Sequence, residues 1–256
     1  MSGADPWRQR LAELADAFAL LTRLPASYLP ALPQATPGAS IWAYPVVGAT
    51  IGALGGVVYW AAHALGCPAP LAALFALAVT ILATGALHED GLADSADGLA
   101  GDTPQQSLAI MRDHRIGTYG AIALLLALGI RTTAVALLAE PGAVLAALIA
   151  AGAAGRASAV MLMAALPAAR NDGLSAAVGR PGGAMTAWAI GLAFGIGILF
   201  LSFGAAVAVL LSAMLTSLLV GGLARAKLGG QTGDVLGAAC VLGECLALTL
   251  LATLAA

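Results

Sequence analysis

Long apolar stretches separated by short polar connections dominate the chain from residue 43 onward. A membrane-spanning helix needs about 20 consecutive apolar residues. One apolar run, from Ala187 to Leu223, is too long for a single span, and its turn signal lies at Ser202–Gly204. The pattern therefore predicts an all-α, polytopic transmembrane helical bundle that forms a single integral membrane domain over residues 1–256. Its seven expected spans cover residues 43–65, 70–87, 118–138, 142–166, 185–202, 204–224 and 234–254.

A shorter and more polar segment precedes these spans. Residues 7–24 place large apolar side chains three or four positions apart, which is the spacing of one helical stripe, while charged residues lie off that stripe. The stripe consists of Trp7, Leu11, Leu14, Phe18 and Leu21. We expect an N-terminal amphipathic helix that lies at the membrane interface.

Composition narrows the possible classes of protein. Hydrophobic residues make up 61% of the chain and charged residues only 9%, against about 25% charged residues in an average soluble domain. This balance excludes a soluble domain and a disordered chain. A net charge of −2 without a basic patch excludes nucleic-acid binding. The expected partner is a lipid bilayer, and assembly into a homo-oligomer is left open.

The positive charges indicate how the bundle is oriented. With seven spans, the N-terminal arm and the connections 88–117, 167–184 and 225–233 lie on one side, and these segments hold nine of the 11 cationic residues. The opposite connections hold none. Because cytoplasmic loops carry the excess of Lys and Arg, we expect this side of the bundle to face the cytoplasm. The nine residues are Arg8, Arg10, Arg23, Arg112, Arg115, Arg170, Arg180, Arg225 and Lys227.

The connection 88–117 holds six of the 13 acidic residues. Asp90, Asp94 and Asp97 have the spacing that places them on one face of a helix, where like charges repel unless a cation neutralises them. Carboxylates are preferred ligands of Mg²⁺ and Mn²⁺, so this cytoplasmic acidic loop is a candidate metal site. A solvated acidic loop with an Asp capping a helix, or an ion-transport pathway, are the alternatives.

The same connection ends in a second group of polar residues. Arg112, Asp113, His114 and Arg115 precede Gly117 and Gly120. Arginine forks match phosphate oxygens, and a carboxylate or histidine can accept a proton from a hydroxyl nucleophile. Together with the acidic face, these residues are typical of phosphoryl transfer. The arginines are equally expected as positive-inside anchors, and His88 and His114 as hydrogen-bonding supports.

Two arginines fall inside expected spans and need partners there. Arg156 and Glu244 are expected at similar depth, which favours either a buried ion pair or an Arg156 that reaches a substrate phosphate. Arg131 is expected to be structural. Asp234 follows a glycine-rich stretch at the start of the last span, where it caps the helix or contributes to an anion site.

Two stretches of the chain, His88–Leu99 and Ile110–Gly120, resemble the signature sequences of the cobalamin synthase family (adenosylcobinamide-GDP ribazoletransferase). Weaker matches are Phe18–Pro25, Gly155-Arg156 and Gly229–Ala238, so the resemblance extends over essentially the whole chain. Val241 stands where this family often has an acidic residue. The resemblance implies a multi-spanning inner-membrane enzyme that requires Mg²⁺. Such an enzyme joins adenosylcobinamide-GDP to α-ribazole, or to its 5′-phosphate, and releases GMP.

From these patterns we assign roles as hypotheses. Glu89, Asp90, Asp94 and Asp97 are expected to hold Mg²⁺. Asp97, Asp113 and His114 are the expected catalytic residues, with Asp113 as general base and His114 as its rival. The expected phosphate- and substrate-binding residues are His88, Arg112, Arg115, Arg156 and Asp234. The alternatives are a CDP-alcohol phosphotransferase, which Asp94-x-x-Asp97-Gly98 resembles in part, and a cation-coupled transporter.

Overall fold

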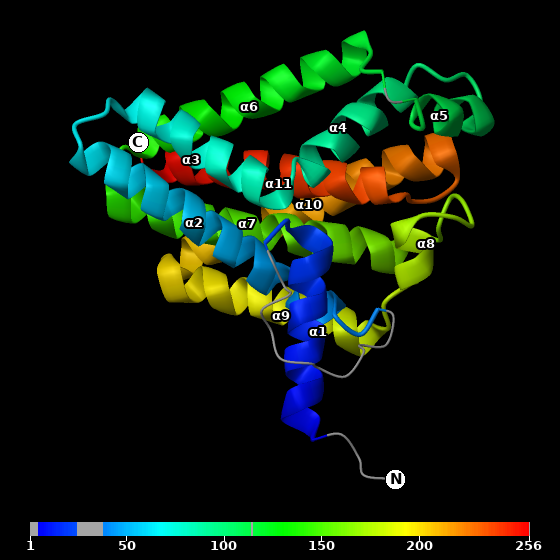
Figure 1. Ribbon diagram of the computed structural model, residues 1–256, viewed down its shortest axis with the longest axis horizontal. Coiled ribbons are helices and arrows are strands. Elements are labelled where there is room, and N and C mark those ends of the chain that lie inside the picture. Colours follow the sequence, from blue (N-terminus) through cyan, green and yellow to red (C-terminus); the bar gives the residue numbers. More distant parts are fainter. Residues whose placement is uncertain (1–4, 25–37, 114, 256) are drawn as a thin grey trace.

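The computed structural model describes residues 5–24, 38–113 and 115–255, and within these ranges it is helical apart from connections and one isolated β-bridge. Its longest helices run side by side through the molecule (Figure 1). The helices are α1 (Pro6–Leu21), η2 (Ile41–Ala43), α2 (Tyr44–Ala64), α3 (Ala69–Thr84), α4 (Leu87–Gly98), α5 (Pro104–Ile110), α6 (Thr118–Leu138), α7 (Pro141–Ala165), α8 (Leu174–Val178), α9 (Gly183–Phe200), α10 (Phe203–Leu228) and α11 (Gly233–Ala255).

Six of these helices are long and apolar enough to cross a membrane. They begin and end close to the predicted spans, and the predicted break between the fifth and sixth spans is confirmed, because α9 ends at Phe200 and α10 begins at Phe203. The expected all-α polytopic bundle is therefore confirmed. The chain is a multi-pass membrane protein.

The span expected over residues 70–87 differs from the prediction. Helix α3 has 16 residues, about 24 Å at 1.5 Å per residue, which is shorter than the hydrocarbon core of about 30 Å. Only α3 and α4 together pass as a seventh span, and they meet at an angle of 88°. The break is formed by two successive residues with left-handed backbone, Gly85 at φ 64° and Ala86 at φ 57°.

Small residues allow the central helix α7 to approach its neighbours closely. At the crossing of α2 and α7, a Cβ atom on Gly48 would clash with the carbonyl of Gly152, and one on Gly52 would clash with that of Leu148. On the other side of α7, a Cβ atom on Gly155 would lie 2.7 Å from the Cys240 carbonyl oxygen of α11. Close approach of this kind drives helix association in lipid, and it makes α7 the most buried candidate span.

The N-terminal segment is helical as expected, and α1 crosses the direction of the bundle beside α2 and α9 (Figure 1). Trp7 and Leu11 of the predicted apolar stripe are exposed, at 58% and 45%, as a lipid-facing surface requires. Glu13, one of the charged residues that lie off the apolar stripe, is buried. It accepts hydrogen bonds from Arg10 and from the Trp42 indole.

Candidate active site

The acidic connection 88–117 is largely helical, since it contains α4, α5 and the start of α6. Helix α4 packs against the beginning of α11 with almost no side chain between them. A Cβ atom on Gly91 would lie 2.7 Å from the Asp234 carbonyl oxygen, and one on Gly237 would lie 3.3 Å from the His88 backbone. This packing fixes the first turn of α4, with His88 and Asp90, beside Asp234.

The three aspartates of α4 do not share one environment. Asp90 is exposed, Asp94 is half-buried and Asp97 is buried. Asp97 accepts hydrogen bonds from the backbone N–H groups of Gly117 and Gly120, at 2.7 and 2.9 Å. These donors lie at the start of α6, where N–H groups have no partner within the helix.

The hydrogen bonds of Asp97 differ from the expected arrangement of one metal-binding face. Among the described residues, no group of three Asp, Glu, His or Cys side chains lies close enough to hold a metal ion together. Glu89, Asp90, Asp94 and Asp97 therefore do not gather in one site here, and their role as Mg²⁺ ligands stays a prediction. The physical reason is competition from backbone donors 20 and 23 residues further along the chain, which helical spacing within α4 does not reveal.

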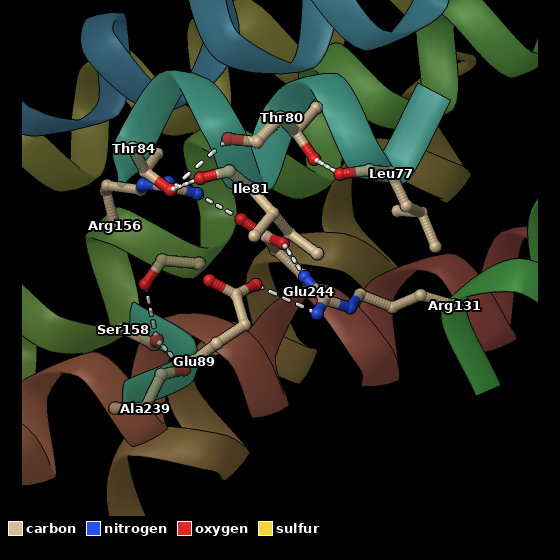
Figure 2. Close-up of polar contacts among 11 residues, drawn as sticks. Leu77, Thr80, Ile81, Thr84, Glu89, Arg131, Arg156, Ser158, Ala239 and Glu244 are labelled. Carbon is tan, nitrogen blue, oxygen red and sulfur yellow. Dashed lines mark hydrogen bonds and ion pairs between the residues drawn. The ribbon is translucent and has the colours of Figure 1, made fainter. Parts of the chain in front are cut away.

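Glu89 is engaged in a buried chain of ion pairs. Its Oε1 accepts from Nη2 of Arg131 at 2.9 Å, and Nη1 of Arg131 lies 3.1 Å from Oε2 of Glu244. The other Glu244 oxygen pairs with Nη1 of Arg156, so the expected Arg156–Glu244 pair is confirmed. Figure 2 shows Glu244 between the two arginines. Both guanidinium groups are nearly inaccessible to solvent, with side-chain exposures of 2% and 3%, which explains how they are tolerated inside spans.

The second polar group lies at the surface. Arg112 donates two hydrogen bonds to Asp172, at 2.9 and 2.7 Å, and so connects the α5–α6 turn to the α7–α8 connection. Arg115 pairs with Asp113 at 2.9 Å, and this pairing raises the pKa of the Arg115 guanidinium. His114 lies outside the described residues, so its expected catalytic role stays a prediction.

Asp234 lies in the first turn of α11, but the capping interaction belongs to another residue. The hydroxyl of Thr232 accepts from the backbone N–H of Val235 at 3.3 Å and donates to Asp234 at 3.2 Å. Of the two roles left open for Asp234, the cap is therefore taken by Thr232, and the anion site stays a prediction. Asp234 instead pairs with Arg170 across the gap to the α7–α8 connection, at 3.4 Å.

The glycine-rich stretch before α11 holds the α7–α8 connection in place. Gln231 donates from its backbone N–H to the Pro167 carbonyl and accepts from the Ala169 N–H, both at 2.8 Å. A Cβ atom on Gly230 would lie 2.5 Å from that same Pro167 oxygen. The Gln231 side chain also accepts from Ser175 at 2.6 Å. This anchoring positions Arg170 and Asp172, which follow directly.

Two pockets adjoin at this end of the bundle. The first has a volume of about 180 Å³, and its mostly apolar wall also contains His88, Arg156 and Asp234. The second has a volume of about 480 Å³ and is the more polar of the two, with Glu89, Asp94, Arg112, Asp113 and Arg115 in its wall; we call it the polar pocket. Asp90 and Arg170 line both pockets. Of the expected site residues described here, only Asp97 lines neither.

The polar pocket suits a divalent cation whose coordination shell is completed by the substrate. Asp90 and Asp94 lie one helical turn apart in the same wall. Mg²⁺ is commonly bound by one or two carboxylates together with water and substrate phosphate. The donor set therefore fits such an ion, although not the four-carboxylate site expected from the sequence.

Arg170 and Asp172 are the site residues that sequence reasoning did not assign. Arg170 counted only as one of the cytoplasmic cations. Asp172 belongs to Asn171-Asp172-Gly173-Leu174, a sequence typical of a turn, for which a nucleotide contact was the other possibility. One sequence feature could have indicated a role for them. The stretch Arg170-Asn171-Asp172-Gly173 is expected on the same side of the membrane as the acidic stretch. Their contacts with Arg112 and Asp234 depend on packing between distant segments, which that position alone does not specify.

The chain is similar to known proteins over most of its length. The chain is 46% identical over 248 residues to an adenosylcobinamide-GDP ribazoletransferase from Bradyrhizobium diazoefficiens, with 94% of both chains covered. It is 43% identical over 234 residues to the protein of the same name from Mesorhizobium japonicum, with 90% and 89% of the two chains covered.

No solved structure matches the chain significantly. The model of the CobS family, described as cobalamin-5-phosphate synthase, matches residues 13–252. This match covers the bundle, both pockets and all four members of the buried ion-pair chain, and the resemblance noted from the sequence is confirmed. The chain belongs to the cobalamin-5-phosphate synthase family.

Proposed function

We propose that this chain joins adenosylcobinamide-GDP to α-ribazole, or to its 5′-phosphate, and releases GMP. The relatives named above carry this activity in their names, and the family assignment replaces the two alternatives of phospholipid synthesis and cation transport. One observation carries the proposal on the structural side. Two adjoining pockets share one carboxylate, Asp90, and one guanidinium, Arg170, which is the arrangement that a reaction between two large substrates at a diphosphate requires.

The reaction exchanges one phosphorus–oxygen bond for another. A ribose hydroxyl oxygen forms a bond to the corrinoid-side phosphorus of the diphosphate, and the bond from that phosphorus to the oxygen of GMP breaks. The hydroxyl proton needs an acceptor. We assign it to Asp113, whose carboxylate lies in the wall of the polar pocket, with His114 as the rival.

The charge of the diphosphate needs neutralisation at the same place. Asp90 and Asp94 would hold Mg²⁺, which when bound neutralises phosphate charge and polarises the phosphorus–oxygen bond. Arg112 and Arg115 line the same pocket. Their carboxylate partners, Asp172 and Asp113, keep them at the pocket in the absence of substrate. Exchange of these partners for phosphate oxygens would provide forked hydrogen bonds.

The proposed location follows from the distribution of charge. Arg112, Arg115, Arg170 and Lys227 all lie at the end of the bundle that carries the pockets, and Lys227 donates to the carbonyls of Leu99 and Gly101 there. The positive-inside rule places this end in the cytoplasm. We therefore propose an inner-membrane enzyme that works at the cytoplasmic surface.

The test is GMP release by purified protein supplied with adenosylcobinamide-GDP, α-ribazole and Mg²⁺. Asp94→Asn should lower turnover at least 100-fold, because a neutral amide is a much poorer magnesium ligand than a carboxylate. Asp102→Asn is the matched control, since Asp102 is exposed on the same connection and lines neither pocket. GMP release by the Asp94 variant at the wild-type rate would exclude this carboxylate from the reaction.

A further inference from the structure

Helix α4 separates the two pockets, and Asp90 lies on the ridge between them. At about 100° per residue, Leu87 and His88 fall on one side of Asp90, while Glu89 and Ala93 fall on the other. The first two residues line the apolar pocket and the second two line the polar pocket. The pockets therefore adjoin at Asp90, and Asp94, one turn further along α4, lines the polar one.

Arg170 reaches this ridge from the α7–α8 connection and is the only basic side chain in the described part of the chain that lines both pockets. Its side chain is 20% exposed. Pro167 and Ala169, which precede it, are hydrogen-bonded to Gln231. These backbone hydrogen bonds fix the segment from which the Arg170 side chain reaches the junction of the two pockets.

The ion pairs of Arg170 are longer than the others at the site. Its Nε lies 3.7 Å from Asp172 and its Nη2 lies 3.4 Å from Asp234. By contrast, Arg112 contacts the same Asp172 at 2.7 Å. A guanidinium with two long contacts has forked donors that a phosphate can engage more closely than either carboxylate does.

We infer that Arg170 is the residue that binds the reacting diphosphate, at the junction of the two pockets. This inference rests on the proposed function and extends it. Displacement at phosphorus requires the entering and leaving oxygens roughly in line. Pockets on two sides of Asp90 and Arg170 allow one substrate arm to approach from each side. Binding of the diphosphate would replace the contacts of Arg170 with Asp172 and Asp234.

The experiment measures binding of adenosylcobinamide-GDP to purified protein without acceptor, so that no turnover is needed. Arg170→Gln should weaken binding about 10- to 100-fold, the usual effect of losing hydrogen bonds to a charged group. Arg170→Lys should fall between wild type and Arg170→Gln, because it keeps the charge and loses the fork.

Arg180→Gln is the control. Arg180 is exposed in the α8–α9 connection, donates to the Ala164 and Ala165 carbonyls, and lines neither pocket, so binding should stay within twofold of wild type. A folded Arg170→Gln protein that binds as tightly as wild type overturns the inference alone. If Arg170→Gln does not fold, binding by Arg170→Lys equal to wild type does the same. Failure of the wild-type protein to bind this substrate would instead contradict the proposed function.

Discussion

At the scale of single residues, the buried ion-pair chain shows how a few charges organise an apolar bundle. Arg131 holds Glu89 in the wall of the polar pocket, and through Glu244 it also acts on Arg156 in the wall of the apolar pocket. The four residues carry no net charge together. Because removal of one partner leaves another charge buried and unpaired, each is costly to replace alone.

Arg131→Met should therefore lower the free energy of unfolding by about 3–5 kcal/mol. The double variant Glu89→Gln/Arg131→Met should recover part of this loss, since it removes both members of one pair. Unfolding in detergent, followed by circular dichroism, measures both values. A double variant that is less stable than Arg131→Met would contradict the pairing.

At this scale, the sequence predicted correctly an ion pair that depends on the depth of two residues in the membrane. Arg156 and Glu244 were expected to meet because each lies about midway along its span. It did not reveal that Gly117 and Gly120, at the start of α6, donate to Asp97. It also missed Arg170, whose partners lie on α11 and in its own connection. Periodicity within one segment specifies a face, but it does not specify which neighbour covers that face.

At the scale of elements, the start of α6 is built around Asp97. A Cβ atom on Gly117 or on Gly120 would collide with the Asp97 carboxylate, so both positions need glycine for close approach. The two N–H donors and the carboxylate together tie the end of α4 to α6. The helices themselves were predictable from apolar length, whereas the break between α3 and α4 was not, because it depends on Ala86 adopting φ 57°.

Gly120→Ala should destabilise the protein by about 1–3 kcal/mol, since the methyl group displaces the Asp97 carboxylate from its cap. Gly129→Ala is the matched control on the same helix. A Cβ atom there meets no atom within 4 Å, and alanine favours the helix by up to about 1 kcal/mol. Melting temperatures of the two variants in detergent compare them directly. Equal effects would show that contact with Asp97 is unimportant.

At the scale of the whole molecule, the connections divide between two ends. The C-terminal end of α11 lies at the end where α2 joins α3, and α5 and α8 lie at the opposite end (Figure 1). Residues of α8 line the apolar pocket and residues that directly follow α5 line the polar pocket, so both pockets lie at that opposite end. If α3 and α4 count as one span, the described helices make seven crossings. The two ends of α11 then face opposite sides of the membrane.

This topology predicts that alkaline phosphatase fused after residue 256 is active and that a fluorescent protein fused there is dark, because both report an exported C-terminus. The same reporters fused within the α10–α11 connection, at Gly229, should give the reverse result. A fluorescent C-terminal fusion would contradict the cytoplasmic placement of the end of the bundle that carries the pockets.

The pairing of Arg156 with Glu244 also has a consequence for the order in which the chain is made. The two residues are 88 positions apart, so at about 5–20 residues per second the ribosome needs roughly 4 to 18 seconds to reach the glutamate after the arginine. Arg131 finds Glu89 already synthesised, but Arg156 enters the bilayer without its acidic partner. The last helix is thus the one that neutralises the centre of the bundle, and a nascent chain that stops before α11 exposes a charge for quality-control proteases to recognise.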